Sequence, residues 1–283
     1  MNTLLAHFKT KDSLDAIIAS PTACYMLVGA PRSGRMASGL YVASQLHCGG
    51  QEGCAGCRRI MTGSDPDTLR IAPNEKGTIT IEMAHNLVGS LSKHANRLGA
   101  TRIVIIQSAE RMTTAAQNAL LKVIEEPPAN TLFMLVLEDR RGVLPTIVSR
   151  CQTVYVRPVS DQAIREYGGP QLVELARNRA GLVMDILNAP ESLGTQMDIR
   201  KDTQARANTI LSVSTFERMI LVDELAKSSD LKEIIDNLAY NVLKSAREQN
   251  ASSQALQSMQ KYFIYGNAGV AAKHALTEMM IRL

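Results

Sequence analysis

A glycine-containing turn near the N-terminus has the spacing of a loop that binds phosphate. Gly29 and Gly34 occupy the two glycine positions of the pattern G-x-x-x-x-G-K-[S/T]. The lysine position is Arg35, and the hydroxyl position that holds Mg²⁺ is Met36, whose thioether is a poor ligand for this hard cation. The pattern therefore indicates either a degenerate phosphate loop or a plain glycine turn between a strand and a helix.

The apolar run at residues 102–106 lacks the acidic pair that a Mg²⁺-nucleotide site needs at the end of its strand. An Asp and a second carboxylate hold the metal and prepare hydrolysis in such sites. This chain has Gln107 and Ser108 there instead. The hydroxyl position at Met36 and this acidic pair, which both handle Mg²⁺, are lost together. We therefore predict that the chain hydrolyses no nucleotide.

Three cysteines, Cys48, Cys54 and Cys57, lie in a glycine-rich segment with ligand-like spacing. Thiolates bind zinc well, and structural zinc takes four tetrahedral ligands, often from C-x2-C pairs. His47 is nearby, but adjacent His47 and Cys48 would chelate one metal awkwardly, so water or a neighbouring chain is the alternative fourth ligand. The rival interpretation is a decayed module with unligated thiols. A C-x2-C redox site is less favoured, because no thioredoxin-like helix start with a proline surrounds these residues.

Strands and helices alternate over residues 24–158, and these elements must position the groups above. Several strand candidates are apolar at consecutive positions, as expected where both faces of a sheet are covered. The alternation predicts a parallel, doubly wound α/β sheet. The expected strands are Cys24–Val28, Thr68–Ile71, Arg102–Gln107, Thr131–Leu137 and Thr153–Val156, and the expected helices are Ser33–Leu46, Ile81–Arg97 and Thr113–Glu126.

Helical periodicity replaces the strands after Pro158. Short helical segments reach to about residue 189, with Asp161–Tyr167 as the first of them. Longer helices are expected after that point, at Ser214–Lys227, Leu231–Gln249 and Ala268–Ile281. We therefore expect a sheet domain, a small helical domain and a helical bundle.

Length and composition limit the class of protein. The 283 residues correspond to about two domains, or three smaller ones. A hydrophobic content of 45% with 20% charged residues is typical of a globular protein, and the net charge of +4 is too small to imply a polyanionic partner by itself. No apolar run reaches the ~18 residues of a membrane helix, and five cysteines argue against a disulfide scaffold. We expect a cytoplasmic protein with no membrane partner.

Five short motifs, in their order and spacing, resemble the bacterial clamp-loader ATPases of the AAA+ class. The resemblance covers roughly residues 1–190. It implies an α/β fold with a RecA-like P-loop (AAA+) parallel sheet domain at 1–158, a cysteine-rich insertion at 47–60, a small helical lid domain at 159–190 and an all-α collar domain for oligomerisation at 191–283. The motifs are Gly29–Met36, Val104–Arg111, Asn118–Lys122, Glu125–Pro128 and Ser149–Cys151.

The resemblance also implies a function. In this family one subunit commonly has a degenerate phosphate loop, whereas the motor subunit (gamma/tau) keeps its lysine and acidic pair. We therefore expect a non-catalytic subunit of the DNA polymerase III clamp loader, with Gly29, Gly34 and Arg35 as a vestigial phosphate loop and no functional ATP/Mg site. Its partners would be the motor (gamma/tau) and delta subunits in a hetero-pentamer, and the sliding clamp and primer–template DNA through the complex.

The same motifs are compatible with two other classes of function. The main alternative is an active P-loop ATPase, similar to the motor subunit, in which Arg35 replaces lysine. A third is a metal- or DNA-binding adaptor that uses the nucleotide fold only as a scaffold.

Arg150 stands at a motif position of the resembled family, where this arginine points across a subunit interface toward ATP held by the neighbour. A guanidinium supplied in trans stabilises charge on the γ-phosphate oxygens during hydrolysis. The alternative is a surface arginine that pairs locally. Leu137 occupies the position of a polar phosphate sensor, and Arg179 is the single candidate for a nucleotide-reading arginine after the sheet domain. Cys151 is interpreted as a lone, unreactive buried cysteine.

The cysteine cluster departs from the pattern of the resembled family at one position. The family inserts a four-cysteine zinc module directly after the phosphate-loop helix. Its fourth cysteine would fall at Ile60 in this chain. The resemblance therefore implies a zinc site made of Cys48, Cys54 and Cys57 that is one protein ligand short.

Overall fold

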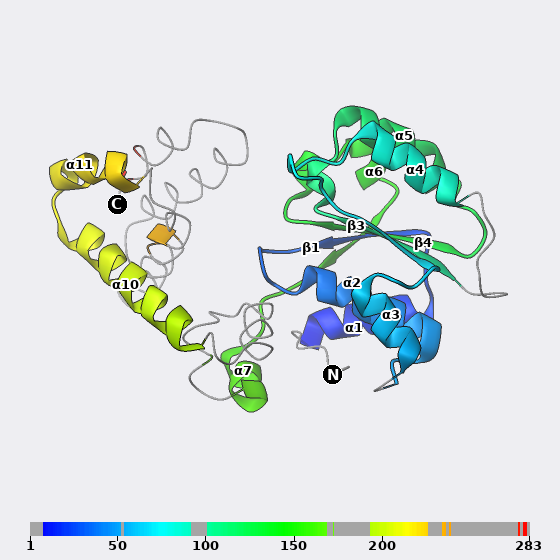
Figure 1. Ribbon diagram of the computed structural model, residues 1–283, viewed down its shortest axis with the longest axis horizontal. Helices are drawn as coiled ribbons and strands as arrows, with labels where there is room; N and C mark the ends of the chain where they lie inside the picture. The colour runs from blue at the N-terminus through cyan, green and yellow to red at the C-terminus, as the bar shows by residue number, and fades with distance from the viewer. Residues whose placement is uncertain are drawn as a thin grey trace. The chain divides into compact units, whose positions relative to one another are not determined.

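The computed structural model describes residues 8–51, 54–91, 101–168 and 193–225, together with single positions of the C-terminal part (Leu172, Ile234, Ile235, Leu238, Thr277, Met280 and Ile281). The chain divides into two compact units, Met1–Ala189 and Pro190–Leu283. The first unit contains a sheet with helices, and the elements described in the second unit are helices (Figure 1).

A five-stranded parallel sheet forms the centre of the first unit, in the order β2-β3-β4-β1-β5. β1 and β4 are buried along their whole length, because each has a strand on both sides and helices above and below. This arrangement is the RecA-like P-loop α/β fold, so the predicted fold class is confirmed. The strands are β1 (Cys24–Val28), β2 (Thr68–Ile71), β3 (Arg102–Gln107), β4 (Thr131–Leu137) and β5 (Gln152–Tyr155).

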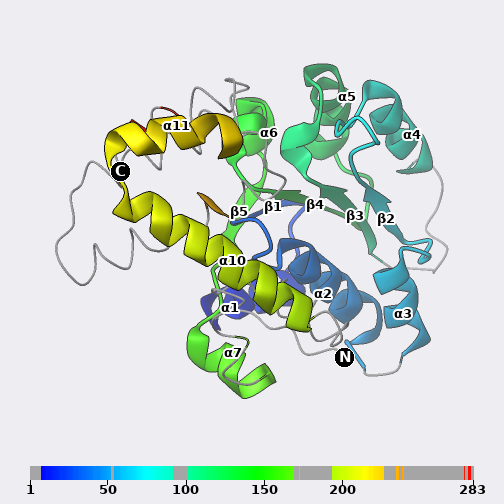
Figure 2. The same ribbon diagram turned by 60° about the vertical axis from the view of Figure 1, so that its left-hand side comes forward.

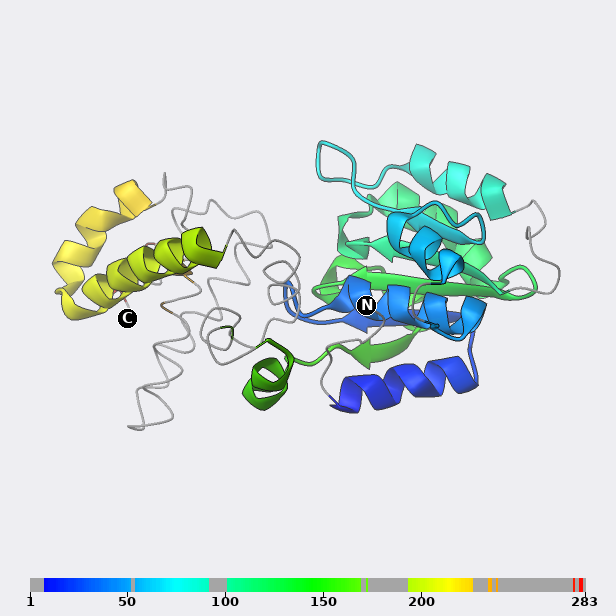
Figure 3. The same ribbon diagram turned by 60° about the horizontal axis from the view of Figure 1, so that its bottom comes forward.

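Helices cover the two faces of the sheet in two groups. One face carries α4 (Ile81–Leu91), α5 (Thr114–Glu125) and α6 (Pro145–Val148), and the other carries α1 (Phe8–Ala19), α2 (Arg35–Cys48) and α3 (Ala55–Thr62) (Figures 1 and 2). Each group encloses its own apolar cluster against the sheet. Figure 3 shows α1 and α2, in blue, side by side on the second face.

The observed bounds agree with most of the predicted ones. Four strands match residue for residue, and β5 begins one residue earlier than expected. α2 begins at Arg35 rather than at Ser33, because Gly34 has a left-handed backbone with φ 93° that does not continue a helix. The helix expected at Ile81–Arg97 is observed as Ile81–Leu91, and the rest of that prediction lies outside the described residues.

Two short 3-10 turns follow the central strands, η1 (Ala109–Arg111) after β3 and η2 (Arg140–Gly142) after β4. α7 (Asp161–Gly168) is the helix expected directly after Pro158. The functional residues proposed from the sequence all lie in the first unit, and Arg179 lies outside the described residues.

The second unit contains α10 (Leu193–Ser212) and α11 (Thr215–Leu225). Ser214 and Glu217 form a reciprocal cap at the start of α11, since Ser214 N donates to Glu217 Oε2 at 2.8 Å and Glu217 N donates to Ser214 Oγ at 3.4 Å. α11 lies within the helix predicted at Ser214–Lys227. The helices predicted at Leu231–Gln249 and Ala268–Ile281 lie almost wholly outside the described residues. Among the helices that the structure describes, none combines the length and the apolar character needed to cross a bilayer.

Candidate functional site

The loop between β1 and α2 requires glycine at both positions of the sequence pattern. The Gly29 N–H donates to the Leu137 carbonyl oxygen at 3.3 Å. A Cβ atom at Gly29 would lie 2.6 Å from the Val156 carbonyl oxygen, so a larger residue would collide with the backbone there. Gly34 lies in the left-handed region and precedes the first residue of α2. The backbone geometry of the loop therefore requires glycine at both positions.

Arg35 and Met36 replace the lysine and the hydroxyl residue of a phosphate loop, and both are engaged within this chain. Arg35 Nη2 donates to Glu138 Oε1 at 3.1 Å. The Arg35 side chain is only 13% exposed, whereas that of Glu138 is 40% exposed. Met36 packs against the apolar cluster on the α1–α2–α3 face. The cationic side chain at the lysine position of the loop is thus paired with a carboxylate that follows β4.

The end of β3 presents no carboxylate at the two predicted positions. Gln107 is half-buried, and Ser108 has a left-handed backbone with φ 52° that leads into η1. The next acidic residue in the sequence is Glu110, whose pKa is raised, mainly by burial and also by the negative charge of Glu138, although backbone hydrogen bonds and Arg35 act in the opposite direction. Glu110 Oε2 is buried and has no hydrogen-bond partner among the described residues.

The position of the polar sensor is filled by an apolar side chain. Leu137 is the last residue of β4 and is fully buried. The next residue, Glu138, is the carboxylate that reaches Arg35. β4 therefore ends with a buried side chain followed by an acidic one.

Arg150 lies on the turn between α6 and β5 and pairs with neighbouring groups. Arg150 Nη1 donates to the Thr146 carbonyl oxygen at 2.8 Å and to Ser149 Oγ at 3.3 Å. Arg150 Nη2 lies 2.7 Å from Glu125 Oε1, and the two side chains are 40% and 41% exposed. These contacts are those of local pairing at the surface. The role of Arg150 in trans stays a prediction.

The interpretation of Cys151 as a lone cysteine is wrong. Cys151 forms a disulfide with Cys24, and their Cα atoms are 4.7 Å apart. The reason is the strand order: β5 pairs with β1 so that Gln152 is opposite Tyr25, which brings the preceding residues together. The disulfide therefore ties the turn that carries Arg150 to the start of β1.

The three cysteines of the cluster meet at one point. Cys48 ends α2, Cys54 is the N-cap residue of α3, and Cys57 lies in the first turn of that helix. Their Sγ atoms all lie within 4.8 Å of one another, and those of Cys48 and Cys57 are 2.9 Å apart. The predicted grouping is confirmed, and its donor set fits three of the four ligands of one zinc ion.

The thiols of this cluster differ in acidity. Burial raises the pKa of the Cys48 thiol to about 12, and hydrogen bonds with Cys57 and Cys54 add to the effect. The pKa of Cys54 is lowered, first by a hydrogen bond from the Cys57 backbone N–H and then by one from the Cys48 thiol. Cys54 is therefore the member of this pair that ionises more readily, and ionisation of Cys48 needs a compensating positive charge such as a metal ion.

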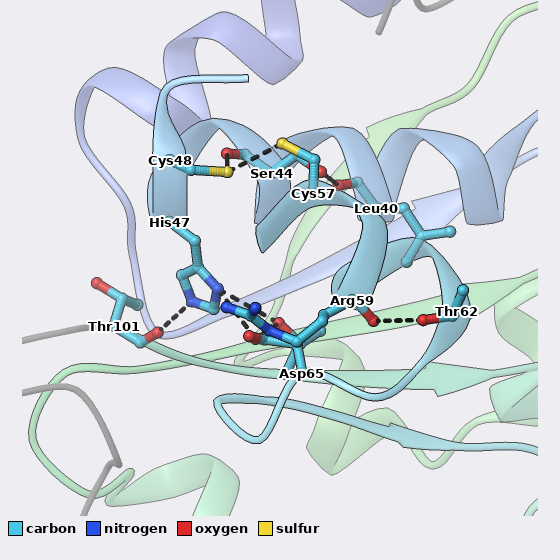
Figure 4. Close-up of polar contacts among 10 residues, drawn as sticks. Leu40, Ser44, His47, Cys48, Cys57, Arg59, Thr62, Asp65 and Thr101 are labelled. Atoms are coloured by element: carbon cyan, nitrogen blue, oxygen red, sulfur yellow. Dashed lines mark hydrogen bonds and ion pairs between the residues drawn. The ribbon is translucent and has the colours of Figure 1, made fainter. Parts of the chain in front are cut away.

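Neither nearby candidate supplies a fourth ligand. His47 points away from the thiols, with Nε2 2.7 Å from the Thr101 carbonyl oxygen and Nδ1 3.3 Å from Asp65 Oδ2 (Figure 4). Its side chain is 1% exposed, so this pairing is buried. Ile60 is fully buried within the apolar cluster of the same face. Among the residues that the structure describes, the cluster therefore offers three thiols and no fourth ligand.

Four residues near these sites were not recognised in the sequence. Glu125 belongs to one of the quoted motifs, but nothing in that motif indicates which side chain it meets. Cys24 could be identified as the partner of Cys151 only from the strand order. The last two are the carboxylates beside Arg35, where Glu138 directly follows the expected sensor position and Glu110 lies three residues after Gln107.

Comparison with known proteins identifies relatives for the first unit. The sequence model of the family described as "DNA polymerase III, delta subunit" matches residues 9–160, which is more than half of the chain. DNA polymerase III subunit delta' of Escherichia coli is 38% identical over 110 residues, covering 38% of this chain and 33% of the relative. DNA polymerase III subunit delta' of Bacillus subtilis is 32% identical over 177 residues, covering 59% of this chain and 52% of the relative. The matched region thus spans between a third and about half of the length of these curated relatives.

A solved structure supports the fold alone. The Holliday junction branch migration motor RuvB of Thermotoga maritima aligns over 84% of this chain and 88% of that chain, with a TM-score of 0.51 and 11% sequence identity. The likeness agrees with the RecA-like P-loop architecture described above.

Proposed function

Because this chain belongs to the family described as DNA polymerase III, delta subunit, we propose that it acts as the delta-prime subunit of a bacterial clamp loader. In this role it takes part in the ATP-dependent loading of the sliding clamp on primed DNA. It does so in a hetero-pentamer with motor (gamma/tau) and delta subunits. The similarity to delta-prime subunits of two bacteria supports this assignment.

The domain roles form part of the same proposal. Residues 1–158 form the AAA+ domain, residues 159–190 form a small lid domain, and residues 191–283 form the collar domain that holds the ring together. The subunit is not an ATPase by itself, because the groups that hold Mg²⁺ and phosphate are replaced at Arg35, Met36, Gln107 and Ser108.

One observation carries the proposal: the two arginines of the AAA+ motifs are in different environments. Arg35, in the loop that would receive nucleotide, is 13% exposed and paired with Glu138. Arg150, at the position that meets a neighbour's nucleotide, is 40% exposed. A chain that offers an arginine but does not use its own loop fits a subunit that completes an ATP site on the next subunit.

The chemistry of Arg150 follows from its guanidinium. Negative charge spreads over the γ-phosphate oxygens in the transition state of hydrolysis, and a planar, two-pronged cation from outside stabilises it. Three acceptors of this chain, on Thr146, Ser149 and Glu125, orient the group at the surface. The local pairing is compatible with a role in trans, because an exposed ion pair is worth only about 0–1 kcal/mol and is readily exchanged.

Reconstitution with the motor and delta subunits tests this function. We expect Arg150→Ala to leave the ring assembled and to lower clamp- and DNA-stimulated ATP hydrolysis. Arg141→Ala is the matched control, since Arg141 is another exposed arginine paired with one carboxylate, Asp139. A complex with Arg150→Ala that hydrolyses ATP and loads clamps at the wild-type rate would refute the role in trans.

The alternative of an active ATPase has its own test. The isolated wild-type chain should show no Mg²⁺-dependent ATP hydrolysis. Turnover that is lost on Arg35→Ala would mean that the chain is a motor-like ATPase and would overturn the proposed function.

We also infer a zinc ion at Cys48, Cys54 and Cys57. The three converging Sγ atoms fit such an ion, and zinc there would crosslink the end of α2 to the start of α3. We assign the fourth position to water or to another chain, because of the described residues nearby His47 is paired elsewhere and Ile60 is packed in the apolar cluster. Elemental analysis should find about one zinc per chain, lost in Cys54→Ser and retained in the control Cys24→Ala. A folded, metal-free wild-type protein would favour the decayed module.

A further inference from the structure

Three charged side chains from three separate segments converge at the degenerate phosphate loop. Arg35 is the first residue of α2, Glu138 follows β4, and Glu110 lies in η1. Arg35 and Glu138 are joined by the 3.1 Å ion pair, and both act electrostatically on Glu110. Two carboxyl groups from other segments thus lie beside Arg35, the residue at the lysine position of the loop.

The position of Glu110 is set by close packing and by backbone N–H groups of Glu110 and Glu138 that donate hydrogen bonds to its carboxylate. A Cβ atom at Gly142 would lie 2.6 Å from the Glu110 Cβ, so the glycine lets η2 approach η1. Glu110 Oε2 is buried without a hydrogen-bond partner among the described residues. An unsatisfied buried carboxyl oxygen is costly, and its retention beside Arg35 calls for a reason.

We propose that Glu138, with Glu110 beside it, excludes the phosphate groups of nucleotides from this loop by occupying the Arg35 guanidinium with a carboxylate of the chain itself. A phosphate that enters must separate Arg35 from Glu138 and must then lie close to one or two carboxyl groups. Both steps oppose binding, because like charges at short range repel strongly where water is partly excluded. The inference rests on the proposed function for its context, namely a clamp-loader subunit that does not use its own nucleotide site.

The inference goes beyond the loss of the lysine and hydroxyl groups. Those losses remove favourable contacts and would leave an anion site that is weak, since the loop glycines and the N-terminus of α2 are still present. An internal carboxylate makes the site unfavourable for phosphate. Removal of the Glu138 carboxylate distinguishes exclusion by a carboxylate from a mere loss of favourable contacts. If the carboxylate excludes the anion, its removal restores binding; if only favourable contacts are lost, its removal has no effect.

The experiment uses the full chain and two probes, ATP and inorganic pyrophosphate, with binding measured by equilibrium dialysis. We expect no saturable binding to the wild type, and saturable binding to Glu138→Gln with a Kd at least about tenfold below the highest ligand concentration at which the wild type shows none. Glutamine keeps the size of the side chain and removes its charge. The double variant Glu110→Gln/Glu138→Gln should bind at least as tightly as Glu138→Gln, and Arg35→Ala/Glu138→Gln should lose the gain.

Asp139→Asn is the matched control. It removes a negative charge one residue further along, but Asp139 pairs with Arg141 and not with Arg35, so it should leave binding unchanged. Thermal unfolding confirms that each variant is folded, and Glu138→Ala replaces Glu138→Gln if the latter is not.

Two results would overturn the inference: folded Glu138 variants that bind no more tightly than the wild type, or an equal gain in Asp139→Asn. Neither result concerns the proposed function, which fails instead if the wild-type chain hydrolyses ATP or if Arg150→Ala has no effect in the complex.

Discussion

Arg35 and Arg150 each form an ion pair with one glutamate, but the first pair lies in the phosphate loop and the second lies on the surface beside α5. Arg35 is 13% exposed and contacts Glu138 at 3.1 Å, whereas Arg150 is 40% exposed and contacts Glu125 at 2.7 Å. The same two residue types therefore make one pair in which the arginine is shielded from solvent and one in which both side chains are exposed.

The difference shows that burial, and not residue type, decides what an arginine can do. An arginine that is shielded from solvent loses more when its carboxylate leaves, because water replaces that contact less well. An exposed pair contributes little to stability and gives up its partner easily. The Arg35 pair is thus suited to keep a site closed, and the Arg150 pair is suited to be exchanged for a phosphate.

The largest expected effect comes from paired lysine substitutions in the reconstituted clamp loader. Arg150→Lys should lose most of the roughly 10³–10⁵-fold acceleration that an arginine in trans gives to one site, because an ammonium cannot make the planar two-pronged contact. Arg35→Lys should leave the rate unchanged. The measurement is clamp- and DNA-stimulated ATP hydrolysis. The total rate falls by less than the rate at one site, since a pentamer contains other ATP sites.

The proposed difference between Arg35 and Arg150 is wrong if the two lysine variants change the ATPase rate equally. Equal rates would mean that Arg150 contacts no nucleotide, and a fall for Arg35→Lys would mean that the degenerate loop takes part in hydrolysis.

The disulfide beside Arg150 gives the next effect, on stability. Cys24→Ala removes a crosslink between residues 127 positions apart, which should lower the free energy of unfolding by about 2–4 kcal/mol. Chemical denaturation with and without a reducing agent measures the loss. Reductant should destabilise the wild type and leave Cys24→Ala unchanged. If reductant has no effect on the wild type, the two cysteines are not crosslinked in solution, and the Arg150 turn is held by hydrogen bonds alone.

The smallest effect concerns Glu110, on the side of the phosphate loop. Its folded-state pKa is raised, mainly by burial, so the folded chain holds this proton to a higher pH than the unfolded chain does. The stability contributed by the protonated form is present below the unfolded pKa and is lost as pH rises through the folded pKa. Denaturation between pH 4 and pH 7 should show this loss in the wild type, and a smaller one in Glu110→Gln. Identical pH profiles of stability in the wild type and in Glu110→Gln would mean that Glu110 does not interact with the charges of Arg35 and Glu138.

The strands and the glycine loop were predictable from the sequence for local reasons. Consecutive apolar residues in β1, β3 and β4 reflect burial on both faces, which a one-dimensional pattern records directly. Gly29 and Gly34 were equally visible, because the backbone demands of the loop act on single residues. The convergence of Cys48, Cys54 and Cys57 followed from their short separation in the chain.

The partners of these groups were decided only by the tertiary structure. Glu138 meets Arg35, Glu125 meets Arg150, and Cys24 meets Cys151 across separations of 103, 25 and 127 residues. The sequence positions of charged residues and cysteines do not indicate which distant residue each will contact. These pairs are therefore selected only by the strand order β2-β3-β4-β1-β5 and by the packing of helices on the sheet. The sequence by itself determined the elements and the losses in the phosphate loop, whereas the fold decided which arginine is shielded and which is left at the surface, because exposure depends on what packs around a side chain.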